Sequence, residues 1–294
     1  MRWLLTGGSG LLGHALSRYL TEHGHQVSVV VGQHQCLVPG VISHHMDLSR
    51  QDDLDDLLDK SRADVIVHAA ALTNVDACEA EPERADFLHA KIADHIASSA
   101  AKNNARFIYI STDHLWAGKN SFICEDQPVE PVNVYAESKA KGEQLVLAVN
   151  ANAQIIRTNF FGVGLPWRDS LWSWMKKKLE SGETVPAFHD AYFTPTCLPL
   201  LSRDIVELAS YQVSGVFNLA GAERLSKFDF AMRLANHMGV ESSLVKAVSM
   251  REVSLVAERP RDLSLSSHRY SEILGRMPPT LDESFAIMDR EKPF

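Results

Sequence analysis

The sequence has few cysteines, and no pattern connects them. Its four cysteines in 294 residues are Cys36, Cys78, Cys124 and Cys197, with no Cys-x-x-Cys pair and no histidine at zinc-ligand spacing. A disulfide framework or a zinc site would need closely spaced cysteines of that kind. We therefore expect reduced thiols, no metal site and a cytoplasmic location.

Long apolar runs and an excess of positive charge are also missing. No stretch approaches the roughly 20 apolar residues that span a bilayer, and the apolar start, MRWLLTGG, is too short for a signal peptide. Acidic residues (37) outnumber Lys and Arg (29), which gives a net charge of −8. An acidic chain gains little from releasing counterions on nucleic acid and is not attracted to an anionic membrane. We therefore expect neither partner.

What the sequence does contain is a regular alternation of short apolar strands and amphipathic helices. Its hydrophobic content of 45% is that of an ordinary globular protein. Strands separated by helices form βαβ units, so we predict an α/β fold with a doubly wound parallel sheet of the Rossmann type. Strands are predicted at 3–5, 25–31, 41–46, 64–70, 105–110, 154–157 and 215–220, and helices at 14–22, 52–60, 83–103 and 135–149.

Three glycines mark a phosphate-binding turn between the first strand and the first helix. Gly7, Gly10 and Gly13 form Gly-x-x-Gly-x-x-Gly. The first permits a tight turn, the second lets the backbone approach a pyrophosphate, and the third lets the helix pack closely on its strand. The helix N-terminus offers N–H groups and the positive end of its dipole to phosphates. The motif predicts a dinucleotide cofactor.

The residues after the second strand bear on the choice of cofactor. A NAD-preferring site places a carboxylate about 20 residues after the glycines, but no Asp or Glu occurs between Glu22 and Asp47. This permits a 2′-phosphate, although no Arg or Lys stands there to bind one. We favour NADP(H) and keep NAD(H) as the alternative. Asp47, which precedes Leu48, is interpreted either as a contact of the adenine amino group or as the N-cap of the next helix.

The alternation weakens after Phe161, which predicts a division of the chain. We assign residues 1–160 to a dinucleotide-binding domain, with 200–222 returning to its sheet. Residues 161–199 and 223–294 are assigned to a smaller, mostly C-terminal substrate-binding lobe. Three tryptophans of this lobe are interpreted either as its core or as stacking partners of a nucleotide base; they are Trp167, Trp172 and Trp174.

A tyrosine and a lysine share one face of the helix predicted at 135–149. Tyr135 and Lys139 are four residues apart, which is one helical turn. A neighbouring ammonium favours the phenolate and lowers the pKa of a phenol, which is ordinarily about 10. Thr112 follows the strand at 105–110, at the edge where parallel sheets bind ligands, and is placed to hydrogen-bond a substrate oxygen. The alternative is a half-buried helix with a solvated lysine, and the phosphate turn favours catalysis.

The longer motifs resemble those of the extended short-chain dehydrogenase/reductase superfamily, and within it the dTDP-4-dehydrorhamnose reductase-like branch of sugar-nucleotide reductases. The resemblance covers nearly the whole chain. The segments that carry it are TGGSGLLG (6–13), MDLS (46–49), HAAALTNVDACE (68–79), YISTDHLWAG (109–118), VNVYAESKAKGE (132–143), RTNFFGVG (157–164), TPT (194–196), GVFNLAGAERLSKFDFA (215–231) and RPRDLSL (259–265).

The resemblance implies roles for single residues. Tyr135 is the implied proton donor, Lys139 lowers its pKa and holds the nicotinamide ribose, and Thr112 orients the keto oxygen. The implied cofactor contacts are Gly7, Ser9, Gly10, Leu11, Leu12, Gly13, Asp47, Leu48, Ala69, Ala70, Tyr135 and Lys139, and Thr158 and Asn159 lie near the nicotinamide end. The candidate substrate contacts are Asp113, His114, Asn159 and Arg259. Arg259, near Arg261, is interpreted either as a clamp for a substrate diphosphate or as part of a surface ion pair.

Two segments depart from the family's pattern. The family commonly has Tyr-Val-Phe-Asp after its Ser-Thr-Asp, where this chain has residues 114–117, HLWA. It usually has Val-Asn in the helix after the fourth strand, where this chain has Leu88 and His89. Both changes are expected near the sugar or the cofactor. His114 is interpreted as a polar residue lining the site or as an extra acid/base.

The activity implied by the resemblance is NADP(H)-dependent reduction of a nucleotide-linked 4-keto-6-deoxysugar, with Tyr135 as proton donor. The expected partners are this nucleotide-sugar and, by default, a second copy of the chain in a homodimer. Two alternatives stay open. One is an epimerase or dehydratase of the same superfamily, which returns its hydride. The other is a non-catalytic, dinucleotide-binding regulatory subunit.

Overall fold

A computed structural model describes residues 1–291 and is built around one parallel sheet. Seven strands follow the order β11-β6-β5-β4-β1-β2-β3, and every neighbouring pair is parallel. The strand order reverses beside β1, as in doubly wound dinucleotide-binding sheets. The predicted fold class is thereby confirmed. The strands are β1 (Arg2–Thr6), β2 (Gln26–Val31), β3 (Ile42–His45), β4 (Val65–His68), β5 (Arg106–Ile110), β6 (Gln154–Thr158) and β11 (Gly215–Leu219).

Helices cover both faces of this sheet, because its central strands are apolar on both sides. Along β1, Trp3 and Leu5 enter one core and Leu4 enters the other, as alternation along a strand requires. One face packs against α1 (Leu11–Glu22), α8 (Leu198–Leu208) and α10 (His268–Leu274), and the other against α2 (Gln51–Ser61), α5 (Ile92–Lys102) and α6 (Val134–Val149). None of the helices within residues 1–291 is long and apolar enough to cross a bilayer.

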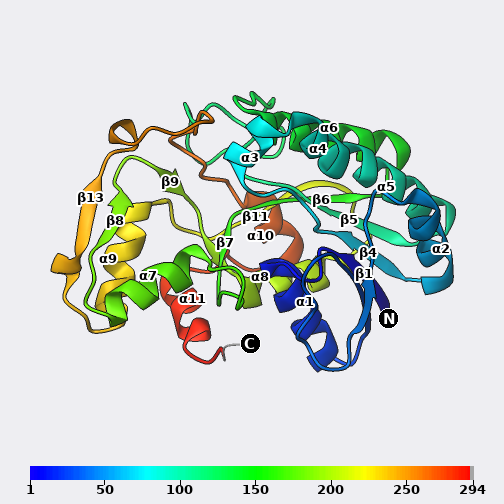
Figure 1. Ribbon diagram of the computed structural model, residues 1–294, viewed down its shortest axis with the longest axis horizontal. Helices are drawn as coiled ribbons and strands as arrows, with labels where there is room; N and C mark the ends of the chain where they lie inside the picture. Colours follow the sequence, from blue (N-terminus) through cyan, green and yellow to red (C-terminus); the bar gives the residue numbers. More distant parts are fainter. Residues whose placement is uncertain (292–294) are drawn as a thin grey trace.

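A smaller lobe lies beside the sheet, on the left of Figure 1. Its core is aromatic: the rings of Phe161, Phe193, Phe230 and Phe285 pack with centroids 5.0–5.9 Å apart. The lobe pairs β7 (Phe160–Phe161) with β10 (Thr196–Cys197), β8 (Val185–Phe188) with β13 (Val245–Val248), and β9 (Tyr192–Phe193) with β12 (Leu225–Ser226). Its helices are α7 (Leu171–Glu180), α9 (Lys227–His237) and α11 (Leu281–Met288), with short 3₁₀ turns at Ser242–Leu244 and Met250–Glu252.

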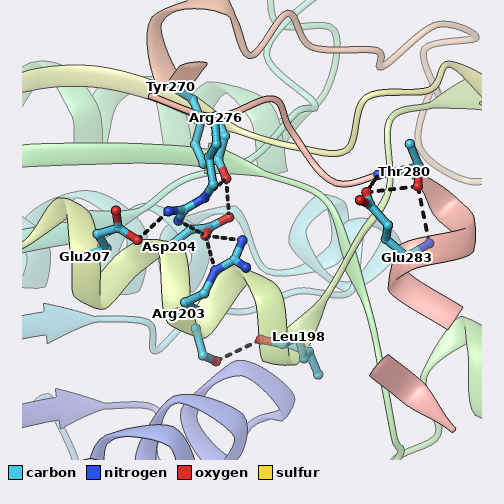
Figure 2. A network of polar contacts seen from close by, with 9 residues as sticks. Leu198, Arg203, Asp204, Glu207, Tyr270, Arg276, Thr280 and Glu283 are labelled. Atoms are coloured by element: carbon cyan, nitrogen blue, oxygen red, sulfur yellow. Dashed lines mark hydrogen bonds and ion pairs between the residues drawn. The ribbon is translucent and has the colours of Figure 1, made fainter. Parts of the chain in front are cut away.

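One late segment packs on the sheet and not in the lobe. The buried carboxylate of Asp204 on α8 accepts hydrogen bonds from Tyr270 (2.9 Å) and Arg276 (2.7 Å), a network shown in Figure 2. Tyr270 and Leu274 also belong to the apolar core beneath β1 and β2. The predicted domain limits stay a prediction, but residues 268–276, assigned there to the lobe, lie on α8 and the sheet.

The long helix predicted at 83–103 is interrupted. It runs as α4 (Pro82–Asp86), a π-helical turn at Phe87–Lys91 and then α5, after the short α3 (Val75–Ala80). Widening a helix in this way frees carbonyl groups from their usual partners. Here His68 of β4 donates to the carbonyl of Leu88 (3.2 Å), and the Tyr109 hydroxyl of β5 donates to that of His89 (2.8 Å). Side chains of the sheet therefore hold the π-helical turn.

Candidate active site

A groove of about 1110 Å³ runs along the carboxyl ends of the sheet strands. The loops after β1, β2, β3, β4, β5 and β6 all contribute to its walls. Ligands of open parallel sheets bind at this edge. The groove brings together every residue that the sequence analysis assigned to the cofactor or to catalysis: Gly7, Ser9, Gly10, Leu11, Leu12, Gly13, Asp47, Leu48, Ala69, Ala70, Thr112, Tyr135 and Lys139.

The glycine turn has the geometry of a phosphate cradle. Gly7 has a positive φ of 74°, and a Cβ there would lie 2.7 Å from the backbone nitrogen of Ala70. A Cβ on Gly13 would lie 2.2 Å from the carbonyl oxygen of Gly7, whereas one on Gly10 would meet nothing closer than 3.2 Å. Gly10 is also the N-cap of α1 and supplies no side-chain acceptor to the first turn. The N–H groups of that turn therefore suit a diphosphate, and these residues fit a dinucleotide.

The far end of the groove lies at the ends of β2 and β3. Asp47 accepts a hydrogen bond from the backbone of Ser49 (2.9 Å), and this contact lowers the pKa of its carboxyl. The N-cap of α2 is Arg50, so the interpretation of Asp47 as that cap is wrong. Gln33 and His34 follow β2 in the groove wall.

A turn from the lobe crosses the groove, and we call residues 165–168 the strap. Leu165 and Arg168 close it with two backbone hydrogen bonds of 2.8 and 2.9 Å. Within it, the Trp167 indole donates to the carbonyl of Ser9 (3.3 Å) and stacks on His34, with ring centroids 4.5 Å apart. Arg168 donates to the hydroxyl of Thr73 on the opposite wall (2.6 Å). The strap therefore contacts both walls.

The three tryptophans are not one cluster. Trp167 belongs to the cofactor groove, as just described. Trp172 is buried in the core of the lobe, as one of the two interpretations expected. Trp174 lines a separate apolar pocket of about 600 Å³ in the lobe.

The predicted catalytic pair begins α6. Asn133 caps this helix by accepting the N–H of Ala136 (2.8 Å), which fixes the first turn that carries Tyr135. Lys139 is buried one turn later and donates to the carbonyl of Ile110 at the end of β5 (2.6 Å). Its ammonium also lies 4.2 Å from the centre of the Tyr109 ring.

Desolvation controls the protonation of this pair. It raises the pKa of Tyr135 to about 12, against the opposing effect of a hydrogen bond with Thr112. It lowers the pKa of Lys139 to about 7, against the attraction of Glu143. The protein alone therefore does not produce the lowered tyrosine pKa that the spacing predicted. Tyr135 keeps its proton at neutral pH and is able to donate it.

The candidate substrate residues divide into two groups. Asp113, His114 and Asn159 line the groove, where the buried carboxylate of Asp113 accepts a hydrogen bond from the Asn159 amide (2.6 Å). Arg259 does not line the groove but forms an ion pair with Asp76 of α3 at 2.8 Å. The structure thus shows the ion pair that the sequence analysis gave as one of two interpretations of Arg259.

Sequence reasoning missed several polar residues around the groove. Arg157 of β6 and Glu143 of α6 form a buried bidentate ion pair, and Ser111 donates to the same carboxylate. Glu143 lies one helical turn after Lys139, so its position on the same face of α6 could have indicated that it lies near the catalytic pair. Arg168 had no such signal, because its partner Thr73 is 95 residues away. Within residues 1–291, no three His, Cys, Asp or Glu side chains gather as metal ligands.

Comparisons with known proteins point to one family of reductases. The RmlD substrate binding domain family matches residues 1–290. A probable low-salt glycan biosynthesis reductase of Haloferax volcanii is 30% identical over 97% of this chain and 96% of its own length. The structure of a hypothetical dTDP-4-dehydrorhamnose reductase from Sulfolobus tokodaii has a TM-score of 0.85 at 34% identity, covering 96% of this chain and 98% of that one.

A second solved structure bears on the cofactor. It is a dTDP-4-dehydrorhamnose reductase from Bacillus anthracis in complex with NADP, with a TM-score of 0.84 at 22% identity and 99% of each chain covered. At that identity the likeness shows the fold. The match to residues 1–290 shows the family: the chain belongs to the RmlD substrate binding domain family, among the dTDP-4-dehydrorhamnose reductase-like members of the extended short-chain dehydrogenase/reductase superfamily.

Proposed function

We propose that the protein is an NADP(H)-dependent reductase of a nucleotide-linked 4-keto-6-deoxysugar. The observation that carries this proposal is the meeting of Thr112, Tyr135 and Lys139 with the glycine turn in one groove. Relatives named as reductases support the reaction class, and the names of two of them include dTDP-4-dehydrorhamnose reductase.

The proposed mechanism assigns one task to each residue. A bound nicotinamide supplies the hydride. Tyr135, protonated at neutral pH, donates its proton to the carbonyl oxygen of the sugar. Thr112 orients that oxygen, and Lys139 holds the nicotinamide ribose and supports the phenolate that is left. General acid catalysis of this kind contributes about 10²–10⁴-fold, and holding the reactants in position contributes the rest.

The proposed cofactor is NADP(H), with NAD(H) as the alternative. Gln33 and His34 stand where a NAD-preferring site has its carboxylate, so no negative charge opposes a 2′-phosphate there. The NADP bound to the Bacillus anthracis reductase supports this choice. We assign the sugar to Asp113, His114 and Asn159, which line the groove beside Tyr135.

The decisive experiment compares two tyrosine variants. Tyr135→Phe removes the proposed proton donor and leaves the glycine turn intact, so kcat with NADPH and a dTDP-4-keto-6-deoxysugar should fall by at least about 10²-fold. Affinity for NADPH, followed by fluorescence, should stay within about threefold of the unchanged protein. Tyr211→Phe is the matched control, because Tyr211 is an exposed tyrosine far from the groove. A Tyr135→Phe protein with unchanged kcat would refute the mechanism.

The same assay separates the two alternatives. An epimerase or dehydratase returns its hydride, so it would convert its substrate with no net loss of NADPH absorbance. A regulatory subunit would bind NADPH, turn over no keto sugar and co-purify with another enzyme. Stoichiometric NADPH oxidation by the protein would exclude both.

A further inference from the structure

The two places where this chain departs from its family's pattern meet at one residue. His89, in the π-helical turn, and His114, after β5, each lie beside the Tyr135 ring. Their ring centroids are 5.6 and 5.7 Å from that of Tyr135, at interplanar angles of 89° and 87°. The proposed proton donor thus has an imidazole in edge contact with it at each of two positions.

His89 belongs to the protein side of this arrangement. Its side chain is fully buried and does not line the groove. Its Nε2 accepts the backbone N–H of Leu72 (2.9 Å), so the ring proton is on Nδ1, which donates to the Ser138 hydroxyl (2.8 Å). Ser138 in turn donates to the backbone carbonyl of Tyr135 (3.0 Å). One chain of hydrogen bonds thus runs from the loop after β4 to the residue that is to donate the proton.

The protonation state of His89 excludes it as an acid. Burial and the nearby Lys139 lower its pKa to about 2, so it is neutral at neutral pH. A second proton would also displace the N–H of Leu72 from Nε2. His89 can therefore hold Tyr135 in place but cannot supply a proton.

His114 belongs to the groove side. It lines the groove, and its backbone N–H donates to the hydroxyl of Thr112 (3.2 Å). Burial lowers its pKa, against the attraction of Asp113. Within residues 1–291 its buried Nδ1 has no hydrogen-bond partner. The ring thus packs on Tyr135, and its Nδ1 is a buried acceptor or donor that is left to be satisfied.

We infer that His89 and His114 are positioning residues that hold the Tyr135 ring in place, and that His114 also offers Nδ1 to a substrate hydroxyl. The inference rests on the proposed function, because Tyr135 is taken as the proton donor. Displacing a reacting group by about 1 Å can cost about 10²-fold in rate. Loss of either ring should therefore lower kcat more than it changes substrate affinity.

The test at His89 compares two substitutions and one control. His89→Leu fills the space but breaks the hydrogen-bond chain, and kcat should fall by about 10- to 100-fold, with KM within about threefold. His89→Asn restores an acceptor and a donor and should recover most of that loss. His268→Asn, at an exposed histidine of α10, should leave kcat unchanged. Equal activity in His89→Leu and in the unchanged protein would overturn the inference, and so would equal impairment of the Leu and Asn variants.

A second readout does not depend on turnover. With ¹³C-labelled tyrosine, the six tyrosines give six signals, and Tyr135 is identified by its loss in Tyr135→Phe. In the NADP⁺ complex this signal should move in His89→Leu and return towards its original position in His89→Asn. If the protein reduces no keto sugar, the proposed function fails and this signal alone decides the inference. If His89→Leu does not fold, Ser138→Ala breaks the same chain while keeping the imidazole, and an unmoved Tyr135 signal there would overturn it.

The His114 side is tested in the same assays. His114→Ala removes the ring and should lower kcat by about tenfold or more. His114→Phe keeps a ring against Tyr135, so kcat should stay within about threefold while KM rises through the loss of Nδ1. Unchanged kcat in His114→Ala would contradict its positioning role, and unchanged KM in His114→Phe would contradict the substrate contact.

Discussion

The side chain of Lys139 is buried in the protein, where desolvation disfavours the charged form of its amine. It is 2% exposed, and burial lowers its pKa to about 7. The unfolded chain has a lysine of ordinary pKa, so between about pH 7 and pH 10.5 it binds a proton that the folded protein does not. By linkage, the contribution of Lys139 to stability increases as the pH rises through that window and is least favourable below it.

Replacing Lys139 by methionine should remove this pH dependence. The free energy of unfolding of Lys139→Met, relative to the unchanged protein, should be highest near pH 6 and should decrease towards pH 10, by about 1.4 kcal/mol for each unit between the two pKa values. Urea unfolding at several pH values measures it. Lys102→Met, at an exposed lysine, is the control and should show no such trend. A difference for Lys139→Met that stays constant with pH would refute the lowered pKa of the buried Lys139.

The glycine turn allows packing to be separated from ligand contact. A Cβ on Gly13 would meet the backbone of Gly7 at 2.2 Å, so Gly13→Ala should lower the free energy of unfolding by about 2 kcal/mol or more. A Cβ on Gly10 has its nearest contact at 3.2 Å, so Gly10→Ala should lower the free energy of unfolding by about 1 kcal/mol or less. The same methyl group fills the space over the turn, so Gly10→Ala should weaken NADPH binding about tenfold. Thermal unfolding and fluorescence titration distinguish the two. Equal losses of stability would contradict this separation.

At the scale of elements, most of the fold could be predicted and its interruptions could not. The strands begin and end within two residues of their predicted bounds, because apolar runs and glycines mark them locally. The π-helical turn at 87–91 has no such local mark. It is held by side chains of the two strands that flank the helix in the chain, His68 and Tyr109, each 20 residues from the carbonyl group that it binds, and the local sequence does not reveal these contacts. The same holds in the groove. The phosphate turn could be predicted from Gly7, Gly10 and Gly13, but nothing near Trp167 in the sequence indicates that its indole binds the carbonyl of Ser9.

The strap should control how fast the cofactor leaves. Trp167 and Arg168 hold it to opposite walls of the groove, so a dinucleotide beneath it is released only when these contacts open. Trp167→Ala together with Arg168→Ala should raise the dissociation rate of NADPH about tenfold, with a smaller effect on the association rate. Stopped-flow displacement of NADPH measures both rates.

The control for the strap is a tryptophan of the same lobe. Trp174 lies outside the groove, so Trp174→Ala should leave the dissociation rate unchanged. An unchanged rate in the double variant would show that the strap does not cover the bound cofactor.

At the scale of the whole molecule, the fold contains contacts between segments far apart in the chain. Asp204 binds Arg276, 72 residues later, and so returns the segment 268–276 to the sheet (Figure 2). The sequence alone predicts this segment in the lobe, because a helix that packs on the sheet and one that packs in the lobe have the same local pattern. The partner of Arg259 could not be predicted from the sequence either. The sequence shows Arg259 and Arg261 around a proline, but not that Arg259 binds the carboxylate of Asp76, 183 residues away.

That carboxylate, Asp76 on α3, anchors the return of the chain beside Asn133 at the start of α6, next to the part of the groove where we propose that the sugar binds. It accepts the backbone N–H of Ala257 (3.1 Å) and the guanidinium of Arg259 (2.8 Å), and Asn133 holds the carbonyl of Glu258 between them (2.8 Å). Asp76→Ala removes two of these three contacts without touching the glycine turn. The free energy of unfolding should fall by about 1–2 kcal/mol, as expected for lost hydrogen bonds to a half-exposed charge.

The kinetic consequence should be confined to one ligand. With residues 257–259 released, KM for the nucleotide-sugar should rise about five- to tenfold. The affinity for NADPH should stay within about twofold, because Asp76 does not line the groove that contains the glycine turn. Asp86→Ala on the neighbouring α4 removes a carboxylate that pairs with the surface lysines Lys91 and Lys141, and it serves as the matched control. Because a general loss of stability would weaken both ligands together, parallel losses of NADPH and sugar binding in Asp76→Ala would show that this anchor supports the fold and not the substrate end of the groove.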